Sequence, residues 1–319
     1  MPESVSSAFS EPEDFAAAFR AEGCLALLIT GRAPFRARLT QVTLNVLRIS
    51  AGEEQLPRIA FIATPGDMVR ITLPMDRSPA PVRGGIATPE GGILTLGPGW
   101  QVHSRTHGSA HWGAISLPVN KLIHYVGTMT GAPFDTPAGV QRWRPAPSAW
   151  RHLRSLHAAA IRMAAHHPQA LVDAEAAHGL EQQLIHAIVE CLAESSADAA
   201  SRSGRRHQDI MVGFERLLHA QSDRDIRIPE ACASLGVSQR LLRSLCAEHL
   251  GMSPTGYDRL RRMSLVRYAL RRGEVAVASV SDVARQYGFH SPGRFAVNYR
   301  AVFGESPSAT LRRGINRSR

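Results

Sequence analysis

The stretch IPEACASLGVSQRLLRSL, residues 228–245, decides the fold of the last third of the chain. Pro229 suits the first turn of a helix, where its missing N–H costs nothing. Gly236 permits the left-handed backbone that redirects the chain, and Ser238 is a preferred residue for capping the helix that follows. A short helix, a glycine turn and a second helix predict a helix-turn-helix motif.

The same pattern recurs in residues 279–303. This copy begins with Ser-Val-Ser-Asp, whose spacing is that of a capping box with Asp in the position usually held by Glu or Gln. Ala284 then takes the place of Cys232, and Gly288 takes the place of Gly236. The chain therefore carries two predicted helix-turn-helix motifs.

One long helix, residues 254–272, is predicted between the two copies. At about 1.5 Å per residue it spans roughly 28 Å, a length that can hold two recognition helices about one DNA turn (~34 Å) apart. About seven helices are expected in a C-terminal domain of residues 207–319. Before it, residues 195–206 (SSADAASRSGRR) are small and polar without periodicity, which predicts a flexible linker.

The net charge of +10 is concentrated near the C-terminus. Residues 1–200 hold 16 basic and 17 acidic residues, a balance of −1, whereas residues 201–319 hold 21 and 10, a balance of +11. Coding bias can explain why Lys121 is the one lysine beside 36 arginines, but it does not explain this placement. A basic domain joined to a near-neutral one is typical of a nucleic-acid reader with a separate sensing or assembly module.

These residues resemble the paired helix-turn-helix domain of AraC/XylS-type bacterial transcription regulators. The resemblance covers about residues 207–315 and is carried by two runs, GVSQRLLRSLCAEHLGMSPTGYDRLRRMSLVRYALRRG and SVSDVARQYGFHSPGRFAVNYRAVFGESPSATL. Its most specific pieces are Gly251-Met-Ser-Pro254 with Tyr257, Tyr287-Gly-Phe289, and Phe303-Gly-Glu-Ser-Pro307. It implies a sequence-specific DNA-binding regulator, more often an activator, that acts on double-stranded promoter DNA as a homodimer and contacts RNA polymerase.

Helix geometry selects candidate DNA-reading residues in the helix expected at 238–250. The predicted buried stripe consists of Leu241, Leu242, Leu245, Cys246 and Leu250, and the opposite face consists of Gln239, Arg240, Arg243 and Ser244. The resemblance places base contacts on Arg240, Arg243 and Ser244. Arginine can make a bidentate contact to guanine, although these arginines can also face phosphate or solvent.

The second recognition helix, expected at 291–303, departs from the family pattern. The positions where the family often has polar readers hold Pro292, Gly293, Ala296 and Val297. We therefore expect the first helix to read most of the sequence and the second to position the protein on the DNA backbone. The candidate backbone contacts are His290, Ser291, Arg294, Asn298 and Arg300. Solvent-facing or phosphate-facing side chains are expected for Arg261, Arg262, Arg271, Arg272, Arg312 and Arg313.

The first half of the chain predicts strands and then helices. Short apolar segments alternate with Pro- and Gly-bearing breaks between residues 24 and 118, as in an antiparallel sandwich or small barrel. The expected strands are Phe35–Leu47, Arg58–Ala63, Met68–Pro74, Gly92–Leu96 and His111–Leu117, and helices are expected from Val119, at Ser148–His166 and at Asp173–Glu194. The pattern predicts an α+β protein with a β-rich domain (1–147), a helical segment (148–194) and the all-α domain. The resemblance to AraC/XylS-type regulators implies that the β-rich domain is cupin-like and binds an effector, and that the helical segment connects the domains or dimerises.

A candidate effector pocket contains Trp100, His103, His107 and Trp112. His111 extends the histidine spacing, but the HxH-plus-Glu pattern of metal-binding cupins is missing, so we expect no metal and no cofactor. One rival reading is a cupin-like metal-dependent enzyme with an appended DNA-binding domain. Another is a ligand-independent dimeric DNA-binding protein.

Other patterns point away from secretion and catalysis. The four cysteines share no CxxC spacing, and the acidic N-terminus, residues 1–14, lacks an apolar signal region. No apolar run approaches the length of a membrane span, and no GxSxG nucleophile motif is present. We expect a soluble cytoplasmic protein that is not an enzyme.

Overall fold

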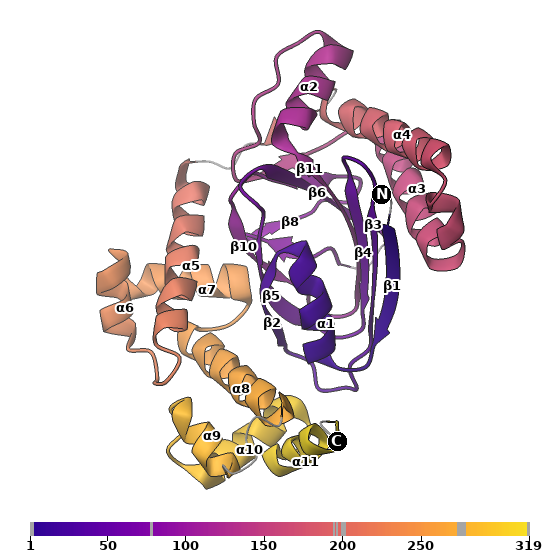
Figure 1. The fold of residues 1–319 in the computed structure, drawn as a ribbon. Coiled ribbons are helices and arrows are strands. Elements are labelled where there is room, and N and C mark those ends of the chain that lie inside the picture. Colours follow the sequence, from indigo (N-terminus) through magenta and orange to yellow (C-terminus); the bar gives the residue numbers. More distant parts are fainter. Residues whose placement is uncertain are drawn as a thin grey trace. The chain divides into compact units, whose positions relative to one another are not determined.

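The computed structural model describes residues 3–76, 79–193, 195, 197–198, 202–272 and 279–317. The chain forms two compact units, one of residues 1–27 with 35–206 and one of residues 28–34 with 207–319 (Figure 1). No helix in the described ranges is long and apolar enough to cross a membrane. All four cysteines are free and buried.

The first unit is built on two β-sheets. The larger has eight strands in the order β1-β3-β4-β11-β6-β9-β12-β13, and its neighbours run antiparallel. Its strands are β1 (Glu3–Phe9), β3 (Ala37–Thr43), β4 (Arg48–Glu54), β6 (Met68–Pro74), β9 (Ile93–Leu96), β11 (Ala110–Pro118), β12 (Val140–Trp143) and β13 (Ala197–Asp198). The five-stranded sheet, in the order β2-β5-β10-β7-β8, has β2 (Cys24–Ile29), β5 (Arg58–Ala63), β7 (Val82–Arg83), β8 (Ile86–Ala87) and β10 (Gln101–Arg105).

Helices cover one face of the larger sheet. The helices of this unit are α1 (Pro12–Phe19), α2 (Val119–Thr130), α3 (Pro147–His166) and α4 (Ala174–Ala193), with short 3-10 turns η1 (Arg20–Glu22) and η2 (Pro168–Leu171). Alternate apolar residues of β6 and β11, such as Ile71 and Ile115, share one core cluster with Leu153 of α3 and Leu184 of α4. Figure 1 shows α3 and α4 side by side along the sheet. Burial of this apolar face is the main stabilising contribution to the unit.

The predicted fold class is confirmed, with the strands β5 and β6 at their expected bounds. The elements that periodicity did not reveal include β1, α1, β4 and β10. The strand β4, RISAGEE, lacks an apolar run because Ser50 and Glu54 are buried against polar partners rather than against apolar ones. The pairing of β4 with β3 and β11 makes it a strand despite its composition.

The predicted linker is partly ordered secondary structure. Helix α5 (Arg202–Ala220) includes the last five linker residues, 202–206, so the prediction of a linker is wrong there. Arginine has a high helix propensity, and residues 202–206 contain three arginines, which favours helix despite the small, polar composition of the predicted linker. Strand β13 lies in the same stretch and pairs with β12. Residues 196 and 199–201 of the predicted linker lie outside the described residues.

The second unit is helical. Seven helices follow residue 201 in the described part of the chain, which agrees with the expected number. They are α5, α6 (Ile228–Leu235), α7 (Gln239–Leu250), α8 (Pro254–Arg272), α9 (Val280–Gln286), α10 (Pro292–Phe303) and α11 (Pro307–Arg317). The long helix α8 has the predicted bounds, and within this unit it runs between the α6–α7 pair and the α9–α11 group (Figure 1).

A buried histidine links α3 to the larger sheet. His157 is fully buried, and its Nε2 donates to the carbonyl of Ser50 in β4 at 3.0 Å. Burial lowers the pKa of His157 from 6.5 to about 4, although the hydrogen bonds to backbone act in the opposite direction. The native unit therefore holds this imidazole neutral at a pH where the unfolded chain binds a proton.

This depressed pKa predicts a loss of stability on acidification. Between pH 6.5 and 4 the unfolded state binds the extra proton, so stability falls as the pH falls. His157→Gln should reduce the difference in unfolding free energy between pH 7 and pH 4.5 by about 2 kcal/mol. All four tryptophans lie in residues 100–150, so tryptophan fluorescence in urea follows this unit. The exposed His178→Gln is the control, and an equal effect of both changes would contradict the prediction.

Candidate nucleic-acid interface

The first helix-turn-helix consists of α6, the turn at Gly236, and α7. Gly236 has a φ of +64°, the left-handed conformation expected from the sequence. Ser238 caps α7, because its side-chain oxygen accepts from the backbone N–H of Leu241 at 3.1 Å. The predicted motif is confirmed. The glycine turn redirects the chain, and the Ser238 cap fixes the residue at which α7 begins.

The second motif consists of α9 and α10. A complete capping box begins α9: Asp282 N–H donates to the Ser279 hydroxyl at 3.2 Å, and Ser279 N–H donates to the Asp282 carboxylate at 3.1 Å. The Ser279 hydroxyl also donates to the Asp282 carboxylate at 2.7 Å, and this bond, together with the bond from the Ser279 N–H, lowers the pKa of Asp282. Gly288 has a φ of +79°, and an added Cβ would lie 2.8 Å from the carbonyl oxygen of Asp223. This glycine is thus required both by its conformation and by close packing.

Helix α7 presents one polar face to solvent. That exposed face contains Gln239, Arg240, Arg243 and Ser244, as the helical periodicity indicates. Its buried face contains Leu242, Leu245, Cys246 and Leu250, while Leu241 is only half-buried. Arg243 lies one turn after Gln239 and donates to its side-chain oxygen at 3.4 Å. Two arginines and an amide are therefore available side by side on an accessible helix surface.

Helix α10 presents a different surface. Phe295 and Tyr299 are buried, and Val297 is 70% exposed. The small residues Pro292, Gly293 and Ala296 are also exposed. Among the candidate backbone contacts, exposed side chains are found at His290, Ser291, Arg294 and Arg300, and Asn298 is half-buried. The accessible face of α10 therefore combines an apolar centre with a few charged or polar side chains.

Three of the arginines expected at the surface lie in the interior. The prediction for Arg261, Arg262 and Arg271 is wrong, because all three are buried. In contrast, exposed side chains are found at Arg272, Arg312 and Arg313. A guanidinium can be buried when carboxylates and carbonyls satisfy its donors. Apart from Asp258, the partners of Arg261 and Arg262 lie 25 or more residues away in the sequence, which is why charge alone suggested a solvated face.

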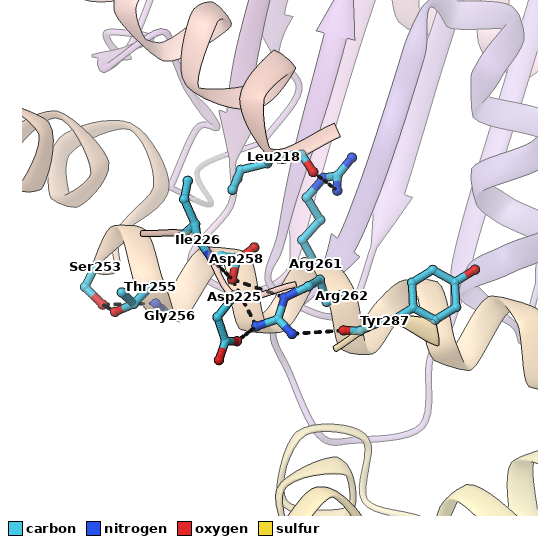
Figure 2. A network of polar contacts seen from close by, with 10 residues as sticks. All are labelled: Leu218, Asp225, Ile226, Ser253, Thr255, Gly256, Asp258, Arg261, Arg262 and Tyr287. Carbon is cyan, nitrogen blue, oxygen red and sulfur yellow. Dashed lines mark hydrogen bonds and ion pairs between the residues drawn. The ribbon is translucent and has the colours of Figure 1, made fainter. Parts of the chain in front are cut away.

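Arg262 is the centre of a buried polar network (Figure 2). Its Nε and Nη2 donate to Asp258 Oδ2 at 3.1 and 3.0 Å, and Nη2 also pairs with Asp225. Its Nη1 donates to the carbonyl of Tyr287 at 2.9 Å, and the guanidinium lies 4.8 Å from the ring centre of Phe289. A single side chain of α8 thus contacts the segment before α6 and the turn after α9.

Asp258 completes this connection. Its Oδ2 also accepts from the backbone N–H of Ile226 at 3.3 Å, at the entry to the first motif. Burial raises the pKa of Asp258 above its usual value, although the neighbouring Arg262 acts in the opposite direction. The i,i+4 pair on α8 therefore ties both helix-turn-helix motifs to one helix.

A second network ties α5 to α8. Tyr257 O–H donates to Glu215 Oε2 at 2.9 Å, and Arg261 Nε donates to Glu215 Oε1 at 3.0 Å. Arg261 Nη1 also donates to the carbonyl of Leu218 at 3.0 Å, a contact drawn in Figure 2. Burial, followed by the nearby Glu215, raises the pKa of Tyr257. These contacts fix α5 against the helix that carries both motifs.

The candidate effector residues lie in different surroundings within the first unit. Trp100 is half-buried, His107 is exposed, and His103 is buried against Phe61 with 4.8 Å between ring centres. Trp112 is buried and donates to Glu54 at 2.6 Å. Glu54 pairs with Arg58, which contacts Ser104, the neighbour of His103 on β10. Successive residues of a strand point to opposite faces, so the His103 side chain points away from the face of β10 on which Ser104 contacts Arg58. Trp112 is linked to that Ser104 face through Glu54 and Arg58.

The histidines of this region do not form a metal cluster. In the parts of the chain that the structure describes, no group of three or more His, Cys, Asp or Glu residues has metal-binding geometry. His111 instead lies 3.8 Å from Glu53 and 3.9 Å from Asp76, and all three side chains are partly exposed.

Comparison with known proteins identifies the C-terminal part of the chain. Residues 231–313 match the family described as "Helix-turn-helix domain". The chain is 39% identical over 103 residues to XylDLEGF operon transcriptional activator 1 of Pseudomonas putida, covering 31% of each protein. It is 31% identical over 154 residues to the probable thc operon regulatory protein of Rhodococcus erythropolis, covering 42% of this chain and 46% of that protein.

The matched stretch therefore spans about a third of the length of the first of these relatives. Among solved structures, the AraC-like transcriptional activator CuxR has a TM-score of 0.42 and 16% identity, and the match covers 89% of this chain and 100% of that one. Residues 231–313 are a helix-turn-helix domain of the AraC/XylS type, and the resemblance predicted from the sequence is confirmed.

The Asp258–Arg262 pair predicts a large effect on stability. Arg262→Ala leaves the buried carboxylate of Asp258 without its main partner, and such a change costs about 3–5 kcal/mol. Urea unfolding followed by far-UV circular dichroism should show the loss in the helical transition. Arg259→Ala, an exposed arginine on the same helix, is the matched control and should stay within about 0.5 kcal/mol of wild type. Equal unfolding free energies for the two variants would rule out this role.

Proposed function

We propose that the protein is a transcription regulator of the AraC/XylS type that binds double-stranded promoter DNA sequence-specifically. The observation that carries this proposal is the exposed polar face of α7, which follows a capped glycine turn and includes Arg240 and Arg243. The basic excess of +11 in residues 201–319 supplies attraction to phosphate. The helix-turn-helix match over residues 231–313 supports the same role.

The two recognition helices have different tasks in this proposal. Helix α7 reads bases, because Arg240, Arg243 and the neighbouring Gln239 and Ser244 can reach base edges in the major groove. Helix α10 lacks comparable readers on its accessible face, where Val297 can offer a methyl contact to thymine. It holds the protein on the DNA backbone through His290, Ser291, Arg294, Asn298 and Arg300.

The N-terminal unit is proposed to sense a small molecule and to support dimerisation, with α3 and α4 as the dimer segment. Binding would shift the population of arrangements that engage promoter half-sites. Activation is the favoured outcome, because the Pseudomonas putida relative is named a transcriptional activator. Activation requires communication with RNA polymerase, and the place of action is the cytoplasm. The proposal includes no enzymatic step and no cofactor.

Arginine substitutions test the division of labour. Binding sites are first selected from random DNA by the wild-type protein, and each position is then varied in gel shifts at fixed salt. Arg243→Ala should relax preference at one base pair by about 1–3 kcal/mol, or roughly 5- to 150-fold. Arg294→Ala should weaken all sequences equally and reduce the slope of log K against log salt by about 1.

The exposed Arg216→Ala on α5 is the charge-matched control, and neither change is expected for it. Equal loss of base preference in Arg243→Ala and Arg294→Ala would refute the division between α7 and α10. Retention of full specificity in a double Arg240→Ala, Arg243→Ala variant would refute base reading by α7.

A further inference from the structure

The interior of the first unit contains an unusual set of buried charges. Five charged residues from four strands and η1 are at least nine-tenths buried. Their relative exposures are 1% for Arg58, 3% for Glu54, 5% for Arg83, 6% for Arg70 and 8% for Glu22. Burying a charge is costly unless an opposite charge or hydrogen bonds compensate for it. The hydrogen bonds and ion pairs of each residue therefore show which of the five buried charges lacks a partner.

The first carboxylate is fully used. Glu54 accepts from Arg58 Nε at 2.7 Å and from Arg58 Nη2 at 3.0 Å, which is a bidentate pair. Trp112 also donates to Glu54 at 2.6 Å. The remaining nitrogen of the same guanidinium, Nη1, donates to the carbonyl and hydroxyl oxygens of Ser104. Glu54 and Arg58 thus compensate each other.

The second carboxylate is also saturated. Glu22 accepts from Gln41 and from Ser50, each at 2.9 Å, and from Arg70 Nη2 at 3.3 Å. The Nε of Arg70 is buried and has no hydrogen-bond partner among the described residues. One donor of this pair is therefore left over.

Arg83 has no carboxylate of its own. It lies directly opposite Ser104 in the β7–β10 pairing, so both side chains point to the same face of the five-stranded sheet. That face also carries Arg58, which bonds to Ser104. In the part of the chain that the structure describes, no ion pair joins the Arg83 guanidinium to a carboxylate. Burial, followed by repulsion from Arg58 and Arg70, lowers the pKa of Arg83 to about 9, although the nearby Glu54 acts in the opposite direction.

The balance of this set is three guanidinium groups against two carboxylates. Cys24 does not add a negative charge, because burial raises the pKa of its thiol to about 12. We propose that this interior binds a small monoanionic carboxylate, with Arg83 as its bidentate partner and Arg70 Nε as a further donor. A single negative charge neutralises the excess, whereas a phosphate dianion would overcompensate it.

The edge of the sheet offers a route to this site. Strands β7 and β8 are two residues each and form the edge hairpin of the five-stranded sheet. Gly84 and Gly85 both have positive φ, at 57° and 78°, and connect them in a tight turn. The hairpin is joined to β10 by only two register pairs. Short edge hairpins open more readily than central strands, so Arg83 lies on the most easily displaced part of the sheet.

This inference names the ligand class of the sensor role proposed above and rests on that role only for its effect on DNA binding. Its first test needs no ligand. In the full-length protein, Arg83→Met should leave Tm unchanged or raise it by about 2–4 °C, because an uncompensated buried charge is removed. Arg58→Met is the matched control and should lower Tm, because it leaves the buried carboxylate of Glu54 without its ion-pair partner. A decrease in Arg83→Met as large as in Arg58→Met would overturn the proposal.

The second test measures binding with sodium butyrate, hexanoate and octanoate at constant ionic strength. Tryptophan-detected Tm and titration calorimetry should show that at least one carboxylate raises the wild-type Tm by about 2 °C or more at ~10 mM. The matched amides should have no effect, and Arg83→Met should lose the shift. Failure of all three carboxylates would overturn the site, as would an equal response to inorganic phosphate.

Gel shifts separate this result from the regulator proposal. Arg83→Met should still bind DNA as wild type does without carboxylate, and the active carboxylate should change DNA affinity in wild type alone. A carboxylate that binds without changing DNA affinity supports the site and overturns the sensor role. Loss of DNA binding by wild type overturns the proposed regulator and leaves the site to be decided by calorimetry.

Discussion

The arrangement of the helical second unit depends on the pair formed by Asp258 and Arg262 on α8. Because the two residues are four apart, they lie on one face of the helix and stabilise each other's burial. Their remaining bonds reach Ile226 before α6 and the carbonyl of Tyr287 after α9. Each motif is thus held in place by its hydrogen bond to α8. The spacing of α7 and α10 is consequently a property of α8, which suits DNA, where successive major-groove segments recur at a fixed interval.

Local signals in the sequence were sufficient for the elements of this unit but not for its interior. The cap at Ser238, the glycine turns and the capping box at Ser279 depend on residues within a few positions, so they could be recognised directly. The burial of Arg262 depends on Tyr287, 25 residues away, and on Asp225. A charged side chain in a basic segment is ordinarily solvated. Only the tertiary structure shows that this one joins two motifs.

The same contrast appears in the β-rich unit. An apolar run made β5 predictable, and the alternation of apolar residues with Arg70 and Thr72 made β6 predictable, whereas β4 could not be recognised because Glu54 occupies an interior position. Its partner Arg58 begins β5, so the apolar character of that strand concealed a buried charge. Helical periodicity likewise revealed α3 and α4 but not the inward-facing His157. Polar residues that compensate one another in an interior leave no periodic signal, since pairing rather than hydrophobicity stabilises them.

Because the four free cysteines are buried, their reaction with a thiol reagent reports local opening of the protein. Cys24 and Cys191 lie in the β-rich unit, and Cys232 and Cys246 lie in the first helix-turn-helix. Burial raises the pKa of Cys246 to about 12, so its reactive thiolate is scarce in the native state. Alkylating reagents can reach this sulfur only when α7 leaves its packed position. The rate of thiol modification, resolved by mass spectrometry, therefore measures how often α7 detaches, without any introduced label.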